Sequence, residues 1–145
     1  MNEREDGTAI IEFVWLAVLL LLPLLYVVLA VFDLQRTAYA ASVAARSASR
    51  AFVSAPDQAS GYRAARVAAA LAFADQGLTT GSVAVTVTCR PRPDQCLSPG
   101  SVVSTQVRAR AALPLAGPLL GDGAPAISVS AVHRSPYGTF REARP

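Results

Sequence analysis

Few side chains of this 145-residue sequence could do chemistry. It has a single histidine, His133, and two cysteines, Cys89 and Cys96. One acidic residue, Glu12, stands at the edge of a long apolar run, five positions after Gly7. The sequence has no glycine-rich phosphate loop, no cluster of metal ligands and no nucleophile paired with a base. We therefore expect no enzyme, no cofactor, no metal and no small-molecule substrate, which leaves the glutamate, the glycine and the two thiols to consider.

The composition narrows the class of protein. Apolar residues make up 52% of the chain and charged residues 16%, which excludes a disordered tail. The net charge of +3 is too small to indicate a nucleic-acid partner.

The apolar residues are concentrated in residues 13–32, a run of twenty residues without a charge. As a helix with a rise of about 1.5 Å per residue, the run would span ~30 Å, the thickness of the hydrocarbon core of a bilayer. Its leucine, valine and phenylalanine side chains favour insertion by about 6 kcal/mol. Glu12 at the edge costs less than the roughly 3 kcal/mol of a central charge. Membrane insertion is therefore expected, and a membrane helix tolerates Pro23.

A cleaved secretory signal is an alternative interpretation of the same run. Ala38, Tyr39 and Ala40 would form its cleavage site, and the secreted chain would begin at Ala41. However, the apolar run is long for a signal peptide, and residues 1–7 contain three acidic residues against one arginine. Both features favour an anchor that stays in the membrane.

An acidic residue at the membrane edge is costly, which makes Glu12 a functional candidate. If the chain is cut after Gly7, Thr8 carries a new α-amine and Glu12 becomes the fifth residue of the mature chain. An ammonium and a carboxylate are each costly in lipid, and pairing them between adjacent subunits removes much of that cost. A plain signal anchor with Glu12 among the lipid headgroups is the alternative.

These residues resemble a known pattern. A short charged leader, a glycine, four small or apolar residues, a glutamate, an aromatic residue and a long apolar helix are similar to a type IV pilin-like protein. Glu12-Phe13 and the apolar run after this pair resemble the TadE-like minor pseudopilins of Tad (Flp) pilus assembly. The C-terminal part adds to the resemblance through the proline- and glycine-broken segment 113–125 and a basic end with Pro136-Tyr137 and Phe140-Arg141-Glu142.

Two positions depart from the pattern of the filament-forming subunits. Phe13 stands where Flp major pilins usually have a tyrosine, and the mature chain would begin with Thr8 instead of phenylalanine. Both departures favour a minor component over the filament subunit.

The resemblance implies that a prepilin peptidase cuts between Gly7 and Thr8, and that Glu12 and Phe13 direct subunit packing in the membrane. It implies a structural or assembly role in a pilus or secretion system. The partners would be the membrane, other pilins or pseudopilins, the Tad membrane platform and its ATPase. The N-terminus would be cytoplasmic and the C-terminal domain extracytoplasmic. An unprocessed, membrane-anchored extracytoplasmic binding domain is the alternative.

Residues 8–53 are predicted as one helix with its membrane core at 13–32, because 33–53 are rich in alanine and contain no glycine or proline. A stripe of mainly small residues recurs along this extension at Leu34, Ala38, Ala41, Ala45, Ala48 and Phe52. The stripe would pack against the protein's own domain or, alternatively, against neighbouring subunits. Residues 1–7 would be the leader, 54–134 a small α+β domain, and 135–145 a flexible tail.

A second helix is predicted over residues 58–76. Asp57 or Ser60 would cap its start and Gly77 would end it. Its apolar side would be marked by Val67, Leu71 and Ala74.

After Gly77 the hydrophobic period changes to two. Apolar residues alternate with polar ones over 83–89, 103–111 and 127–133, which is typical of half-buried strands. A small antiparallel three-stranded sheet packed on the long helix gives a membrane-anchored α+β fold. Residues 113–125 contain three prolines and three glycines, so they would fold irregularly over one end of the sheet or form an assembly contact.

Cys89 and Cys96 bracket the sequence RPRPDQ between the first two strands. At facing strand ends the two thiols are close enough to bridge, and a disulfide fits an oxidising, extracytoplasmic domain. Two free buried thiols are the alternative. A zinc site is disfavoured because it needs four ligands, and the cysteines and His133 supply three.

Overall fold

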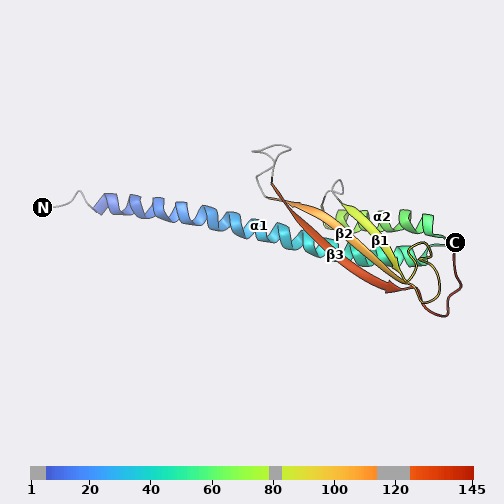
Figure 1. The fold of residues 1–145 in the computed structure, drawn as a ribbon. Helices are drawn as coiled ribbons and strands as arrows, with labels where there is room; N and C mark the ends of the chain where they lie inside the picture. The colour runs from blue at the N-terminus through green and yellow to red at the C-terminus, as the bar shows by residue number, and fades with distance from the viewer. Residues whose placement is uncertain (1–5, 79–82, 114–124) are drawn as a thin grey trace.

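The structure, a computed structural model, describes residues 6–78, 83–113 and 125–145. Its elements are helix α1, Asp6–Ser54; helix α2, Gln58–Ala74; and the strands β1, Ala84–Arg90, β2, Val102–Ala112, and β3, Ala126–Pro136 (Figure 1). The strands form one antiparallel sheet in the order β1-β2-β3. The predicted arrangement of a long apolar N-terminal helix, a second helix and a three-stranded antiparallel sheet is confirmed.

Helix α1 has 49 residues and continues through Pro23. At about 1.5 Å per residue it is roughly 70 Å long. Its first half extends away from the rest of the chain, whereas its second half lies along the sheet and α2 (Figure 1). The first α1 residue that the domain buries is Thr37. The apolar residues 13–32 are therefore left uncovered by the described part of the chain.

The second half of α1 packs through small side chains. Ala41, Ala45, Ala48 and Phe52 are buried, and Leu34 at the start of the same stripe is half-buried. Alanine side chains let a helix approach its neighbours closely. Because α1 contacts α2, β2 and β3, the interpretation that this stripe packs against the protein's own domain is confirmed.

Helix α2 turns a different face toward the core from the predicted one. Val67 and Leu71 are each 59% exposed, whereas Ala65, Ala69 and Phe73 are buried. The predicted apolar side was therefore wrong. Alanines occur on every side of this helix, so the hydrophobic period does not single out one face, and packing favours the small residues that bring α2 close to α1.

Gly61 shows how close that approach is. A Cβ atom on Gly61 would lie 3.1 Å from Cδ2 of Phe52, which is buried on α1. The Phe52 ring also meets the ring of Tyr62 edge to face, with the centroids 5.1 Å apart. The glycine therefore makes room for the aromatic residue that closes this end of the helix pair.

The ends of α2 are set by Asp57 and Gly77, as predicted. The Asp57 carboxylate accepts a hydrogen bond of 2.8 Å from the backbone N–H of Ser60, and this bond lowers the pKa of Asp57. A lowered folded-state pKa means that the cap stabilises the fold above the ordinary pKa and is lost as the pH falls through the folded-state value. Gly77 has a φ of 64°, and the N–H of Leu78 bonds the carbonyl of Phe73, as in a Schellman motif.

One face of the sheet lies on α1 and the other points outward. In β2, the buried residues include Val103, Val107 and Ala109. The exposed residues that alternate with them include Arg108 and Arg110. The same alternation holds in β1 and, from Val129 onward, in β3. The predicted period of two is therefore confirmed in β1 and β2 and in most of β3, whereas Ile127 at the start of β3 is 45% exposed.

Thr105 breaks the apolar pattern on the inner face of the sheet. It is 0% exposed, and its hydroxyl has no hydrogen-bond partner among the described residues. Its neighbours across the sheet are Val87 and His133. An unpaired buried hydroxyl has lost its bonds to water without replacement.

Thr105→Val is expected to raise the free energy of unfolding by about 1 kcal/mol, because it removes this hydroxyl and keeps the side-chain shape. Chemical denaturation of the detergent-solubilised chain measures the change. Thr105→Ala is the control, since it also removes the hydroxyl but leaves a cavity and should lower stability. A Thr105→Val chain less stable than the wild type would show that the hydroxyl is bonded in the native protein.

The structure corrects the expectation of a loose tail over residues 135–145. Strand β3 continues to Pro136, and Tyr137 is only 1% exposed. The hydroxyl of Tyr137 donates to the carbonyl of Glu142 at 2.8 Å, and the backbone N–H of Arg144 donates to the carbonyl of Leu97 at 2.8 Å. The segment is thus folded back on the domain.

Two arginines of this segment satisfy the C-terminal end of α1. The Arg141 guanidinium donates to the carbonyl of Val53 at 3.0 Å, and that of Arg144 donates to the carbonyl of Ala55 at 2.8 Å. The last turn of α1 contains no basic residue. The C-terminal segment therefore supplies the positive charge that the negative end of the helix dipole favours.

Arg144→Ala is expected to lower the free energy of unfolding by about 1–2 kcal/mol, because charge-assisted bonds to the end of α1 are lost. Thermal denaturation measures the loss. Arg46→Ala removes the same charge from an exposed position on α1 and should change stability little. Equal effects of the two variants would show that Arg144 does not act as a cap.

Two segments expected from the sequence fall partly outside the described residues. They are residues 1–5 of the expected leader and residues 114–124 of the expected irregular segment.

Candidate functional site

Gly7, Thr8, Glu12 and Phe13, here called the N-terminal motif, lie in the first turns of α1. The Gly7–Thr8 peptide bond falls one residue after the start of the helix. Residue 8 precedes residue 12 by four positions, so the two lie on the same side of the helix, about 6 Å apart along its axis. Helical backbone thus places the N-terminus that cleavage would create one turn before the glutamate.

The surroundings of Glu12 are apolar and uncovered. Its side chain is exposed, and so are Ile10, Ile11 and Phe13, the last to 71%. The most apolar part of α1 is 0% buried by the rest of the described chain. The described residues therefore leave these side chains uncovered.

One helix in the described part of the chain is long and apolar enough to cross a membrane, and it lies near the N-terminus. Thr37, where burial in the domain begins, lies five positions after Phe32, the end of the apolar run. That interval is about 8 Å of helix. In a bilayer, the α+β domain would therefore sit directly on the membrane surface.

The predicted disulfide between Cys89 and Cys96 is confirmed. The two Cα atoms are 5.2 Å apart, and both side chains are buried. The bond closes the loop after β1, and the carboxamide of Gln58 holds this loop by donating to the carbonyl of Asp94 and accepting from the N–H of Cys96. The alternative of two free thiols is excluded, because the sulfur atoms are bonded to each other.

Replacing both cysteines by serine is expected to lower the free energy of unfolding by about 2.5 kcal/mol, the chain-entropy estimate for a closed loop of eight residues. Chemical denaturation of the full chain measures the loss, and a reducing agent should lower the wild-type stability to match. A double variant as stable as the oxidised wild type would mean that the loop keeps its shape without the bond.

The single histidine of the chain lies in the sheet. His133 lies on β3 opposite Thr105, on the inner face of the sheet. Among the described residues there is no group of three or more histidine, cysteine or acidic side chains that could hold a metal ion.

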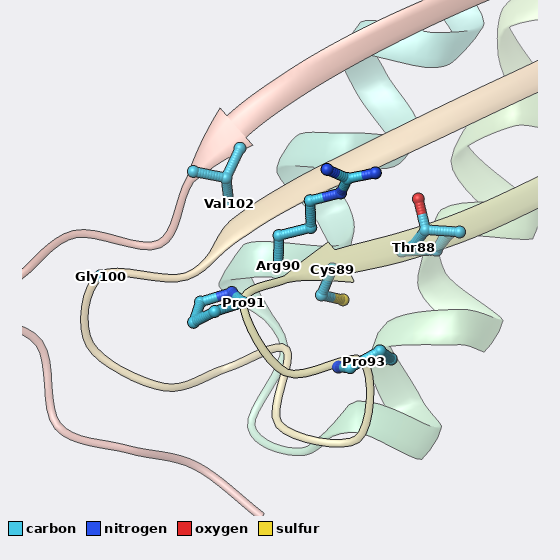
Figure 2. A pocket seen from close by; sticks show the side chains of 8 residues that line it. Thr88, Cys89, Arg90, Pro91, Pro93, Gly100 and Val102 are labelled. Atoms are coloured by element: carbon cyan, nitrogen blue, oxygen red, sulfur yellow. The ribbon is translucent and has the colours of Figure 1, made fainter.

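The sequence analysis missed a hollow on the outer face of the sheet. Thr88, Arg90, Val102, Ser104 and Arg134 line this cavity of about 450 Å³, here called the arginine hollow. It adjoins a larger one of about 850 Å³, whose lining includes Arg90, Pro91 and Val102 (Figure 2). The period of two could have placed Arg90 and Arg134 on the outer face, but only the strand pairing brings them to one place.

The geometry therefore offers three features: an acid in an apolar, uncovered helix, a disulfide-closed loop, and an arginine-lined hollow. The chain was compared with protein-family profiles, with curated proteins and with solved structures, and none of these comparisons gave a match.

Proposed function

We propose that this chain is a pilin-like subunit of a Tad-type pilus assembly or secretion system, similar to a TadE-like minor pseudopilin. The observation that carries the proposal is the single helix α1, Asp6–Ser54. It joins the N-terminal motif, the apolar run and the alanine stripe under the sheet without a break. One helix can thus both pack between subunits in the membrane and support the domain outside it.

In this proposal, a prepilin peptidase cuts the Gly7–Thr8 bond, and Glu12 pairs with the new amine of an adjacent subunit. The ammonium would otherwise add positive charge to the positive end of the helix dipole, so a carboxylate is needed close by. The disulfide supports an extracytoplasmic position for the domain, because such bonds persist in oxidising compartments. The N-terminus is then cytoplasmic, and the role is structural.

The test is the N-terminus of the protein in cells that contain an active prepilin peptidase. The full chain is extracted from membranes in detergent, and its first residue is found by N-terminal sequencing and intact mass. A start at Thr8 supports the proposal, and cells with an inactive peptidase should then give a start at Met1. A start at Met1 in both cells would identify a plain membrane anchor, and a start at Ala41 a secreted protein.

A further inference from the structure

The charge of the chain is unevenly distributed. Twelve of the thirteen arginines follow residue 32, against six of the ten acidic residues. The strands β1, β2 and β3 contain four arginines and no acidic residue. By the alternation of the sheet, Arg90, Arg108, Arg110 and Arg134 all lie on the outer face and are exposed. This face is therefore positive along its whole length.

Strand pairing brings two of these arginines, Arg90 and Arg134, together at one end of the face. Thr88, Ser104 and Arg134 form one row across the three strands, and Arg90 lies in the next row, opposite Val102. The two arginines thus reach over β2 from its two sides and both line the arginine hollow. Two guanidinium groups that share a cavity without an acidic lining residue repel each other, and a bound oxyanion would relieve the repulsion.

The other residues that line the arginine hollow and the adjoining cavity indicate which further chemical groups the ligand has. Ser104 places a hydroxyl in the arginine hollow, while the Thr88 hydroxyl already donates to the carbonyl of Ser104 at 3.4 Å. Pro91 and Pro93 of the disulfide-closed loop give the adjoining cavity an apolar wall (Figure 2). An occupant with acidic groups, hydroxyl groups and apolar ring faces would match these surfaces.

The position of the hollow favours a ligand met outside the cell. It lies where β1 and β3 end, close to the C-terminus and to the end of α1, at the end of the domain farthest from the apolar half of α1 (Figure 1). The face also lacks the side chains that single-stranded nucleic acids stack on, since the three strands contain no phenylalanine, tyrosine or tryptophan.

We propose that the outer face of the sheet binds an acidic polysaccharide, with an acidic group seated between Arg90 and Arg134. The guanidinium groups hold the carboxylate, and Ser104 bonds a sugar hydroxyl. Arg108 and Arg110 lie roughly 14 and 20 Å further along β2 from Ser104, where later acidic units of the same chain can reach them. The inference rests on the extracytoplasmic position of the proposed function, but not on cleavage after Gly7.

The test uses the full chain in detergent micelles and fluorescently labelled alginate oligomers, which are chains of uronic acids. Binding is followed by fluorescence anisotropy, with neutral dextran and double-stranded DNA as comparison polymers. We expect saturable binding of alginate that weakens as salt is added, and no binding of dextran. The double variant Arg90→Gln/Arg134→Gln should bind alginate at least about tenfold more weakly.

Arg46→Gln/Arg50→Gln is the matched control, because it removes two exposed arginines from α1, away from the sheet face. Circular dichroism verifies that both double variants are folded. An equal loss of binding in the control would overturn the proposal in favour of diffuse electrostatic attraction. Binding of DNA as tight as that of alginate, or no saturable binding of alginate, would also overturn it. Since the measurement does not depend on the first residue of the chain, a failure here is distinguishable from a failure of the processing test.

Discussion

With leucine in place of Gly7, the protein from cells with an active prepilin peptidase is expected to keep residues 1–7. The resemblance to pilin-like proteins places a glycine directly before the bond that is cut, and leucine adds four carbon atoms at that position. The Gly7–Thr8 bond lies in the first turn of α1, so a bulky side chain there also crowds the enzyme that must reach the helix end. We expect processing to fall from complete to undetectable.

Intact mass of the membrane-extracted protein measures this change directly, because the processed and unprocessed chains differ by seven residues. Gly7→Ala is the matched variant, since it alters the same position by one methyl group and should leave processing detectable. A Gly7→Leu chain that still begins at Thr8 would contradict the assignment of the site. Membrane insertion should be the same in all three chains, because residues 13–32 are unchanged.

The elements of the fold that depend on local sequence could be predicted closely. The helix expected over 8–53 is Asp6–Ser54, since a long run rich in leucine and alanine without glycine favours helix, and this preference carries the helix through Pro23. The strand β2 expected over 103–111 is Val102–Ala112, because strict alternation specifies both the strand and its buried face. The disulfide could also be predicted from local sequence, because its two cysteines are only seven positions apart.

What could not be predicted depends on contacts between distant segments. The C-terminal segment has the composition of a loose tail, but Arg141 and Arg144 find unpaired carbonyls at the end of α1, almost ninety positions earlier. The buried side of α2 was predicted wrongly, because alanines occur on every side of this helix and its contact with α1 decides which side is buried. Arg90 and Arg134 are separated by more than forty positions and meet only through the pairing of both strands with β2.

The N-terminal motif differs from these cases, because the role proposed for it concerns other molecules. The structure places Gly7, Thr8, Glu12 and Phe13 on one continuous helix, whereas cleavage and subunit packing remain predictions. The described residues leave the apolar helix around Glu12 uncovered, so the structure of a single chain does not test these predictions.

Glu12→Ala is expected to leave insertion and cleavage intact and to reduce assembled pili by roughly a hundredfold. Insertion persists because the apolar run favours it and the variant removes a charge. Cleavage persists because the bond lies one helical turn earlier. Assembly fails because the amine of Thr8 then enters the membrane without a carboxylate. Breaking such a pair costs about 3 kcal/mol or more, which is a factor of about one hundred in an equilibrium constant.

Two further variants separate charge from shape. Glu12→Gln keeps the size of the side chain without its charge and should fail like Glu12→Ala, whereas Glu12→Asp keeps the charge and should assemble in part. Glu142→Ala is the control, because it removes an exposed acid from the C-terminal segment. Pili are quantified in sheared surface fractions, alongside the membrane-bound, processed subunit. A normal pilus yield from Glu12→Ala, with Thr8 as its first residue, would show that the carboxylate does not neutralise a neighbouring amine. In that case the ammonium would lie unpaired between subunits without reducing assembly.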